Sequence, residues 1–273
     1  MAIGNCMESN AVIWPVKRTV FGVGVSLTDY SDLVGRVIVA AKQRASAAID
    51  FMPVHGLVTA ARDPQFREMM NDFDVVAPDG QPVRWSLNMF HRARLSDRVY
   101  GPELTRRLCE AAAREGVSIY LYGSSPEVID KLRTRLLEWF PNLMIAGAES
   151  PPFRPLTSSE TEQAIERINS SGAGIVFLGT GCPRQEIFAH QNRAKIRAVQ
   201  LCVGAAFDFH AGAKKMAPKW MQSRGLEWLF RLLSEPRRLG KRYLVTNTTF
   251  LALFAREWLV TLARRGSPSA AAD

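Results

Sequence analysis

The chain has 273 residues, of which 47% are hydrophobic and 22% are charged, so it can bury a core as one α/β domain with or without an appendage. Its first residues lack the basic and apolar regions of a signal peptide, and no uninterrupted apolar run is long enough to span a bilayer. The four cysteines lie far apart with no C-x-x-C pair, which argues against a metal site or a disulfide framework and favours free thiols in a reducing compartment.

The positive charge is concentrated near the C-terminus. The net charge is +9, and residues 214–273 hold 12 Lys and Arg against 4 Asp and Glu, whereas the preceding residues hold 23 against 22. A localised basic segment indicates an anionic partner, which could be nucleic acid, anionic lipid or a phosphorylated substrate.

Short apolar runs alternate with amphipathic helical patterns from residue 19 to residue 207. We predict strands at 19–25, 74–77, 117–123, 143–148, 173–179 and 198–207, and helices at 30–45, 101–116, 125–140, 157–172 and 183–195. This alternation predicts a mostly parallel sheet with helices on both faces. Because ligands of such sheets bind beyond the carboxyl ends of the strands, the turns after 74–77, 117–123 and 173–179 are the candidate sites.

The turn after 117–123 reads YLYGSSPEV. Gly123 ends the strand, and Ser124 and Glu127 have the spacing of a capping box. A well-capped helix explains these serines individually, but the free N–H groups of a helix N-terminus also attract phosphate. We therefore keep Gly123 as a candidate for binding the substrate.

The turn after 173–179 reads FLGTGCPRQEIF. It begins at Gly179 and has neither the G-K-[ST] ending of a P-loop nor the third glycine of a dinucleotide fingerprint. A polar first helical turn that favours the helix dipole explains Glu186. It explains Gln185 less well, because Gln185 lies next to the expected crevice. Gly179 and Gln185 are both candidates.

A lone carboxylate, Asp79, follows the strand at 74–77 in the sequence APDGQPVRW. Pro-Asp-Gly is common turn chemistry, and Asp suits a helix N-cap, so a structural role is at least as probable on this stretch alone. The functional alternative is a general base, since a partly desolvated carboxylate can take a proton from a hydroxyl group once its pKa is raised toward neutrality.

The basic C-terminal segment interleaves charges with aromatic residues from residue 207 onward. After Tyr243 comes a mostly apolar stretch that Arg256 and Glu257 interrupt, which suits a helix lying in a membrane interface better than one that spans it. A helical pair packed on the core with a solvated basic face is the structural alternative. Single-stranded nucleic acid is a further possible ligand, although no known nucleic-acid module is present.

Six stretches, in order, resemble glycosyltransferase family 26, the WecG/TagA/CpsF family of bacterial surface-polysaccharide enzymes: APDG, DRVYG, LYGSSPEV, FLGTGCPRQE, VGAAFDFHAGAKKMAPKW and GLEWLFRLLSEPRRLGKRY. The likeness runs from the first strand to Tyr243. It implies a Rossmann-like, doubly wound α/β core (1–213), a basic, membrane-associating helical appendage (214–265) and a disordered tail (266–273).

The resemblance also implies the activity. Members of this family transfer a sugar from a UDP-sugar to a polyprenyl-diphosphate-linked sugar at the cytoplasmic face of the cell membrane, with inversion. They use no metal or other cofactor, and this sequence has no Asp-x-Asp at a strand end, since DFD at 72–74 precedes its strand and DFH at 208–210 lacks the second Asp. A homo-oligomer is a family expectation, and a nucleic-acid partner is not expected.

The family's functional residues carry over to positions in these motifs. Asp79 matches the general base, Arg98 an arginine near the substrate phosphates, and Gln185 a glutamine at the sugar or nucleotide. Asp208 matches a polar position near the same crevice, with a structural role equally plausible. The arginines that hold the acceptor diphosphate, for which a planar guanidinium is suited, correspond to Arg231, Arg237, Arg238 and Arg242.

One element departs from the family pattern. A Thr-x-Asn pair usually ends the strand before the one that carries PDG, and here the stretch is IDFMPVHG, with Phe51 and Pro53 near the expected places. Asp50 and His55 are the polar residues that could replace the pair. The departure leaves the donor sugar open, and it motivates an alternative in which the protein is a catalytically altered nucleotide-binding scaffold of the same fold.

Overall fold

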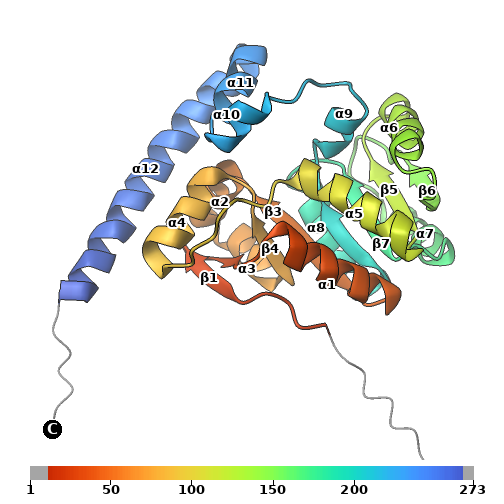
Figure 1. The fold of residues 1–273 in the computed structure, drawn as a ribbon, viewed down its shortest axis with the longest axis horizontal. Helices are drawn as coiled ribbons and strands as arrows, with labels where there is room; N and C mark the ends of the chain where they lie inside the picture. The colour runs from red at the N-terminus through yellow and green to blue at the C-terminus, as the bar shows by residue number, and fades with distance from the viewer. Residues whose placement is uncertain (1–11, 267–273) are drawn as a thin grey trace, which may run out of the picture.

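A computed structural model describes residues 12–266, with the side chains of residues 238 and 264–266 excepted. At its centre is a parallel six-stranded sheet (Figure 1) in the order β4-β3-β8-β7-β5-β6. The strands span β3 Ala47–Met52, β4 Val75–Pro78, β5 Ile119–Gly123, β6 Ile145–Glu149, β7 Ile175–Gly179 and β8 Val199–Cys202. All five pairings are parallel, so the carboxyl ends of the six strands lie at the same edge of the sheet.

Helices cover both faces of this sheet, as a parallel sheet requires. On one face lie α1 (Tyr30–Lys42), α5 (Gly101–Glu115), α6 (Pro126–Trp139) and the short α9 (Ala206–His210). On the other lie α2 (Val54–Arg62), α3 (Pro64–Asp72), α4 (Gln81–His91), α7 (Ser158–Ser170) and α8 (Arg184–Asn192). The strand side chains alternate between the two layers, with Ile49 and Phe51 on the first and Ala48 and Met52 on the second. The predicted Rossmann-like, doubly wound architecture is confirmed.

The segment 19–25 is a hairpin, so the prediction of one strand there was wrong. β1 (Lys17–Val20) pairs antiparallel with β2 (Val23–Ser26), and Val20 lies opposite Val23. Phe21 and Gly22 form the turn with φ values of 50° and 84°. Both residues have positive φ, as a two-residue hairpin turn of the right twist requires. The apolar run concealed the turn because Phe21 is itself buried.

The predicted strand at 198–207 is also too long. β8 ends at Cys202, and the chain then turns at Gly204, with φ +49°, into α9. Val203, Ala206 and Phe207 are buried in the helical layer rather than in the strand, which explains the continuous apolar pattern. Three helices between β3 and α5 were not predicted from periodicity: α2, α3 and α4.

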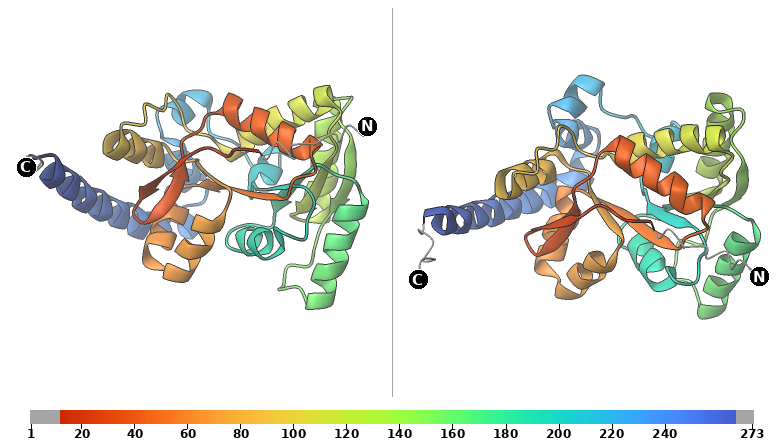
Figure 2. Two further views of the ribbon diagram at one scale, coloured as in Figure 1. Left: turned by 90° about the horizontal axis from the view of Figure 1, so that it is seen from below. Right: turned by 60° about the horizontal axis from the view of Figure 1, so that its bottom comes forward.

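The C-terminal residues form α10 (Lys219–Ser223), α11 (Glu227–Ser234) and the long α12 (Pro236–Gly266). α12 packs against α2 and α4, and its far end projects past the core (Figure 2). Phe250 of α12 is buried, with its ring 5.5 Å from that of Phe21 in the hairpin turn. Within residues 12–266, no helix has both the length and the apolar character needed to cross a membrane. The expected tail begins at Gly266, where α12 ends, and residues 267–273 lie outside the described part of the chain.

Gly123 and Gly179 lie opposite each other where β5 and β7 end, and the backbones approach closely there. A Cβ on Gly123 would lie 2.4 Å from the backbone of Gly179, and φ at Gly123 is +139°. A Cβ on Gly179 would lie 2.6 Å from the ring of Phe207. Both glycines are therefore required for packing, whatever they bind.

We predict that Gly123→Ala lowers the free energy of unfolding by about 3 kcal/mol or more, because the added methyl group meets backbone in a conformation that L-residues avoid. Gly35→Ala is the matched control. Gly35 lies within α1 with nothing within 4 Å of an added Cβ, so this change should be neutral or stabilise by about 0.5–1 kcal/mol. Urea unfolding followed by circular dichroism measures both, and equal midpoints would refute the packing argument.

Candidate active site

Asp79 lies directly beyond the end of β4, where the sheet opens. Its backbone N–H donates to the carbonyl of Met52 in β3 (3.2 Å), which extends the ladder by one residue and fixes Asp79 at the sheet edge. The side chain is 19% exposed, and Oδ1 has no hydrogen-bond partner in the described structure. The pKa of Asp79 is raised to about 7, chiefly by burial; the charge of Glu227 contributes to the rise, while the charges of Arg98 and Arg231 oppose it. A carboxyl group with this pKa can exchange a proton at neutral pH.

The segment that carries Arg98 crosses the end of β4. Val99 donates a backbone hydrogen bond to the carbonyl of Pro78 (2.9 Å), which places the residues on either side of it next to Asp79. Arg98 is 9% exposed, and its Nη1 lies 3.1 Å from the main-chain oxygen of Asp79 but 3.9 Å from the carboxylate oxygen Oδ1. The guanidinium is thus hydrogen-bonded to the backbone of Asp79 and not to its carboxylate.

Glu227, the first residue of α11, occupies the other side of Arg98. Its Oε2 accepts from Arg98 Nη2 (2.6 Å), and its Oε1 accepts from the hydroxyl of Tyr100 (2.9 Å). All three residues are buried, and Arg98 also lies over the Tyr100 ring, with Cζ 4.3 Å from the centroid. Burial and the charge of Glu227 raise the pKa of Tyr100 well above its ordinary value, so the phenol keeps its proton and donates. The C-terminal helices therefore reach into the site at the sheet edge.

A second acidic pair lies one strand away. Asp50 of β3 and Glu186 of α8 are both buried, and burial raises the pKa of each. The charge of Glu186 and the hydrogen bond between the two carboxyl groups raise the pKa of Asp50 further. Glu186 lies in the first turn of α8, as expected, and its side chain is buried there. Asp50 is the polar residue that the altered stretch IDFMPVHG contributes here.

Gln185 links the turns after β7 and β8. Its Oε1 accepts from the N–H of Gly181 (3.2 Å), and its Nε2 donates to Glu186 (2.9 Å). It is 5% exposed and contacts the position where a side chain at Gly204 would start. The structure thus places Gln185 at the expected crevice, where it orients the buried acidic pair.

Asp208 lies on α9 at the neighbouring strand ends. Its Oδ1 accepts from Ser124 Oγ (3.4 Å), and its Oδ2 pairs with Lys214 (2.6 Å). Ser124 follows Gly123 directly and has φ +60°. Asp208 therefore joins the turn after β5 to the start of the basic segment.

A groove of about 230 Å³ runs between α9 and α11. It is lined by two aromatic residues, three basic residues and two other polar residues, namely Phe209, Phe230, Lys214, Lys215, Arg231, Ser234 and Glu235. Arg231 is half-buried over the Phe209 ring, and its charge lowers the pKa of Asp79, so the groove shares one residue with the electrostatic surroundings of that carboxylate. Its basic and aromatic lining suits an anionic group attached to a ring or a chain.

The other predicted arginines of the appendage differ in their exposure to solvent. Arg242 is half-buried and lies near the N-terminus of α2. The pKa of His55 is lowered there, mainly by the burial of His55 itself and also by the charge of Arg242. Its Nε is buried without a hydrogen-bond partner in the described structure. Arg237 is exposed, and the side chain of Arg238 lies outside the described residues. Of the four predicted arginines, Arg231 and Arg242 are thus placed at the sheet edge.

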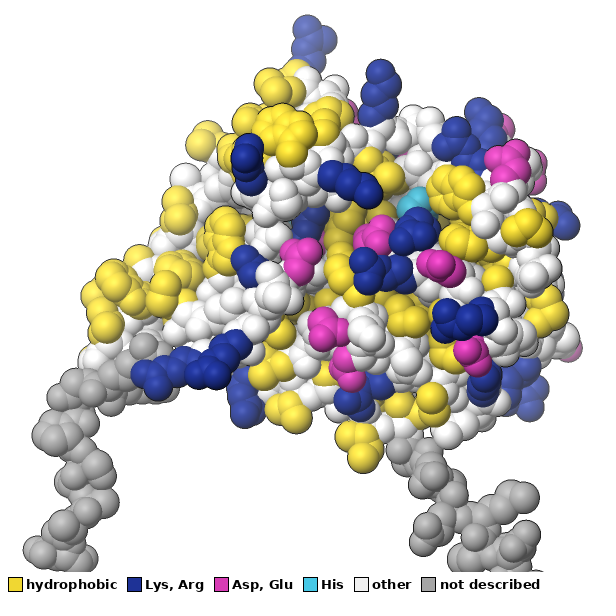
Figure 3. All heavy atoms as spheres, viewed as in Figure 1, with side chains coloured by type: hydrophobic (Ala, Val, Ile, Leu, Met, Phe, Trp, Pro, Cys, Tyr) yellow, Lys and Arg dark blue, Asp and Glu magenta, His cyan; other side chains and the backbone are white. Residues whose placement is uncertain are grey.

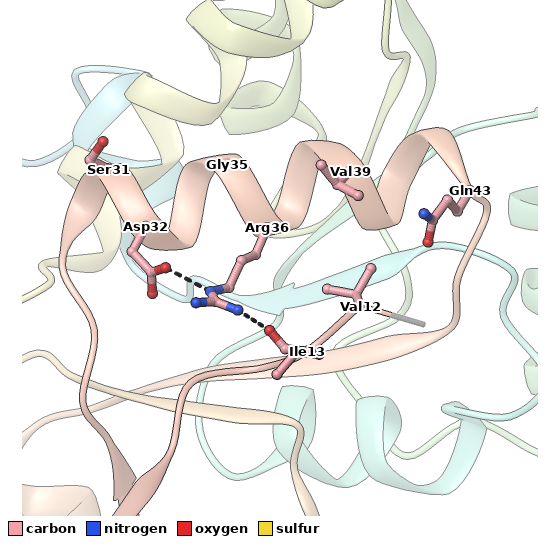
Figure 4. A pocket seen from close by; sticks show the side chains of 8 residues that line it. All are labelled: Val12, Ile13, Ser31, Asp32, Gly35, Arg36, Val39 and Gln43. Atoms are coloured by element: carbon pink, nitrogen blue, oxygen red, sulfur yellow. Dashed lines mark hydrogen bonds and ion pairs between the residues drawn. The ribbon is translucent and has the colours of Figure 1, made fainter. Parts of the chain in front are cut away.

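A larger hollow of about 650 Å³ lies between the N-terminal segment and α1 (Figure 4). Arg36 closes one side of it by pairing with Asp32 (2.7 Å) and by donating to the carbonyl of Ile13. None of the predicted site residues lines this hollow.

Sequence reasoning missed Glu227 and Tyr100. A signal for Glu227 was present, because GLEWLF places one carboxylate among large apolar residues in a segment that is otherwise basic. An acid in such a position is either exposed at a helix start or buried with a cation, and Arg98 was already a candidate. Tyr100 had no comparable signal, since a tyrosine before a helix is ordinary.

The family described as "Glycosyl transferase WecG/TagA/CpsF family" matches residues 18–264, which covers the six-stranded sheet, the strand-end turns, α10, α11 and nearly all of α12.

We predict that Asp79→Asn stabilises the protein more at pH 8 than at pH 5. The ordinary Asp pKa is about 3.9, so an Asp79 pKa of about 7 means that folding favours the neutral form, and that this stabilisation is lost as pH rises from about 4 through 7. Asn is neutral throughout and escapes this loss, which amounts to at most a few kcal/mol. Melting temperatures of both proteins at the two pH values measure the effect, with Asp130→Asn on the exposed face of α6 as the control. A difference independent of pH would contradict the raised pKa.

Proposed function

Because the chain belongs to the WecG/TagA/CpsF glycosyltransferase family of cell-surface polysaccharide biosynthesis, we propose that it is an inverting hexosyltransferase that moves a sugar from a UDP-sugar to a polyprenyl-diphosphate-linked sugar. In this proposal it acts on the cytoplasmic face of the cell membrane, without a metal, in exopolysaccharide or related surface-polymer synthesis. A homo-oligomer and the division into a core (1–213) and a membrane-associating appendage (214–265) belong to the same proposal.

The observation that carries the proposal is the state of Asp79. Its buried carboxylate lies at the open edge of a parallel sheet, is not hydrogen-bonded to the adjacent guanidinium, and has a pKa of about 7. We propose that Asp79 takes the proton of the acceptor hydroxyl as its oxygen attacks the anomeric carbon. The bond from that carbon to the UDP oxygen breaks on the opposite face, which inverts the configuration, and the electron pair leaves with UDP.

The leaving UDP gains negative charge, which the protein must stabilise. α6 begins shortly after Gly123 and α8 shortly after Gly179, so both helix N-termini lie near the sheet edge, where their dipoles favour negative charge. Arg242 adds a cation at the same edge. Preorganised donors and charges of this kind supply the stabilisation that a metal provides in other transferases.

The acceptor has a diphosphate and a long apolar chain, and the C-terminal helices offer a surface for each. The groove lined by Lys214, Lys215 and Arg231 suits a diphosphate. Along α12, large apolar side chains are exposed (Figure 3), namely Leu244, Val245, Leu251, Trp258, Leu259, Val260 and Leu262. An exposed apolar stripe beside basic residues favours binding to an anionic lipid surface, where the acceptor resides.

We predict that purified full-length protein releases UDP in the presence of an acceptor, and that Asp79→Asn lowers the rate at least 100-fold, as loss of a general base does. A panel of UDP-sugars with short-chain lipid-diphosphate-sugar acceptors identifies the donor. Full activity of Asp79→Asn would remove the base assignment. Silence across the panel with UDP still bound would favour a scaffold that has lost catalysis, and salt-dependent binding to RNA or DNA without UDP competition would favour a nucleic-acid binder.

We also predict that Arg231→Gln raises KM for the acceptor about tenfold or more while KM for the donor changes little, since a lost charge-assisted contact to phosphate costs about 1.5–3 kcal/mol. Lys219→Gln is the matched control, because Lys219 is exposed on α10 outside the groove. Initial rates at varied acceptor concentration measure the effect. An equal effect of both changes would mean that only the overall positive charge matters.

A further inference from the structure

The position of Glu227 raises the question of why an acidic residue should reach a site that handles diphosphates. It lies at the start of a helix in the most basic part of the chain, and it is only 8% exposed. Both of its carboxylate oxygens have partners, one in Arg98 and one in Tyr100. A buried carboxylate with two directed hydrogen bonds holds its partners in one geometry.

That geometry determines which acceptors the guanidinium N–H groups of Arg98 bind. Nη2 of the guanidinium donates to Glu227 at 2.6 Å, and Nη1 donates to the main-chain oxygen of Asp79 at 3.1 Å. The distance from Nη1 to Oδ1 of the Asp79 carboxylate is 3.9 Å. An arginine this close to a carboxylate would otherwise form the bidentate pair that both groups favour. Such a pair would bind the oxygens of Asp79 and hold it ionised, so that it would be a weak base.

We propose that Glu227 is a positioning residue, which holds the Arg98 guanidinium so that it does not hydrogen-bond to the Asp79 carboxylate, whose Oδ1 stays available to accept a proton. This inference rests on the proposed role of Asp79 as the base. It assigns to the C-terminal helices a part in the chemistry itself, in addition to binding the acceptor, because α11 supplies the residue that controls the base.

The other groups that face Asp79 are few and fit this assignment. Arg231 of α11 and the backbone N–H of Gly101 in α5 lower its pKa. The charge of Asp79 in turn raises the pKa values of Tyr30 of α1, Tyr100 and Asp50 of β3. Asp97 also acts on Tyr30, but its carboxylate accepts from Gln81 at 2.9 Å. Among these groups, Arg98 and Glu227 are the two whose charges act most strongly on Asp79, and they act in opposite directions.

The test measures the titration of Asp79 directly, by carbon NMR of the full-length protein labelled at the aspartate carboxyl carbons. The Asp79 signal is assigned by its absence in Asp79→Asn. We expect a midpoint near pH 7 in the wild type and a midpoint at least one pH unit lower in Glu227→Gln, which is a tenfold loss of proton affinity. Glu227→Asp should restore most of the shift because a carboxylate that can bind Arg98 remains. Glu257→Gln, on α12 outside the cluster, should leave the midpoint unchanged. An unchanged midpoint in Glu227→Gln would overturn the proposal.

Release of α11 from the core would also hydrate Asp79 and lower its midpoint, and a double variant separates this from the proposal. If Arg98 moves onto Asp79 in Glu227→Gln, then adding Arg98→Gln must return the midpoint to the wild-type value or above. If the double variant keeps the low midpoint, hydration is the cause and the proposal fails.

The pH dependence of kcat/KM for sugar transfer gives a second readout. Its acid limb should move to lower pH in Glu227→Gln together with the NMR midpoint, whereas a structural loss would lower the rate at every pH without moving the limb. Failure of the proposed function appears differently, because Asp79→Asn would then remain active while the NMR midpoints still followed Glu227.

Discussion

The site depends on one constraint, which is that a carboxylate lies buried at the sheet edge beside an arginine that does not neutralise it. Arg98 is bound instead by Glu227 and by the backbone of Asp79, so the strongest ion pair in the site joins the core to α11. The same contact orders the loop before α5, positions Tyr100 and brings the basic groove beside Asp79. Removing the C-terminal helices would therefore change the chemistry of the core site as well as its substrate contacts.

Much of the fold follows from the sequence, because a parallel sheet buried on both faces leaves apolar runs that are hard to mistake. β4, β5, β6 and β7 lie within a residue or two of their predicted limits, and so do α5, α6 and α7 with their clear cap signals. β3 and the helices α2, α3 and α4 were not predicted from periodicity. The two errors in strand limits occurred where apolar residues serve two purposes. Phe21 makes a turn and fills the core, and Val203 to Phe207 leave the strand while staying buried.

The candidate site was predictable in its strand-end residues and not in its long-range partners. Asp79, Gln185 and Asp208 each follow a strand, so the parallel topology alone brings them to one edge. Glu227 reaches that edge only because the C-terminal segment returns to Arg98 and Tyr100, and local pattern carries little information about such a return. The pairing of Asp50 with Glu186 is of the same kind, since it depends on β3 lying beside β8 and beneath α8.

The packing of Phe21 on Phe250 also constrains the order in which the protein is built. Phe21 lies in the first hairpin of the chain and Phe250 in its last helix, with Phe90 of α4 beside both Phe21 and the neighbouring Phe254. During synthesis the hairpin and α4 emerge from the ribosome early, and their aromatic surface has no cover until nearly the whole chain has been translated. Because Glu227 precedes Phe250 on the same C-terminal segment, the docking that buries this surface also secures the charge arrangement around Asp79. All six strands of the sheet are therefore synthesised before Glu227, and the side chains that α11 adds to the site come from the last part of the chain to be made.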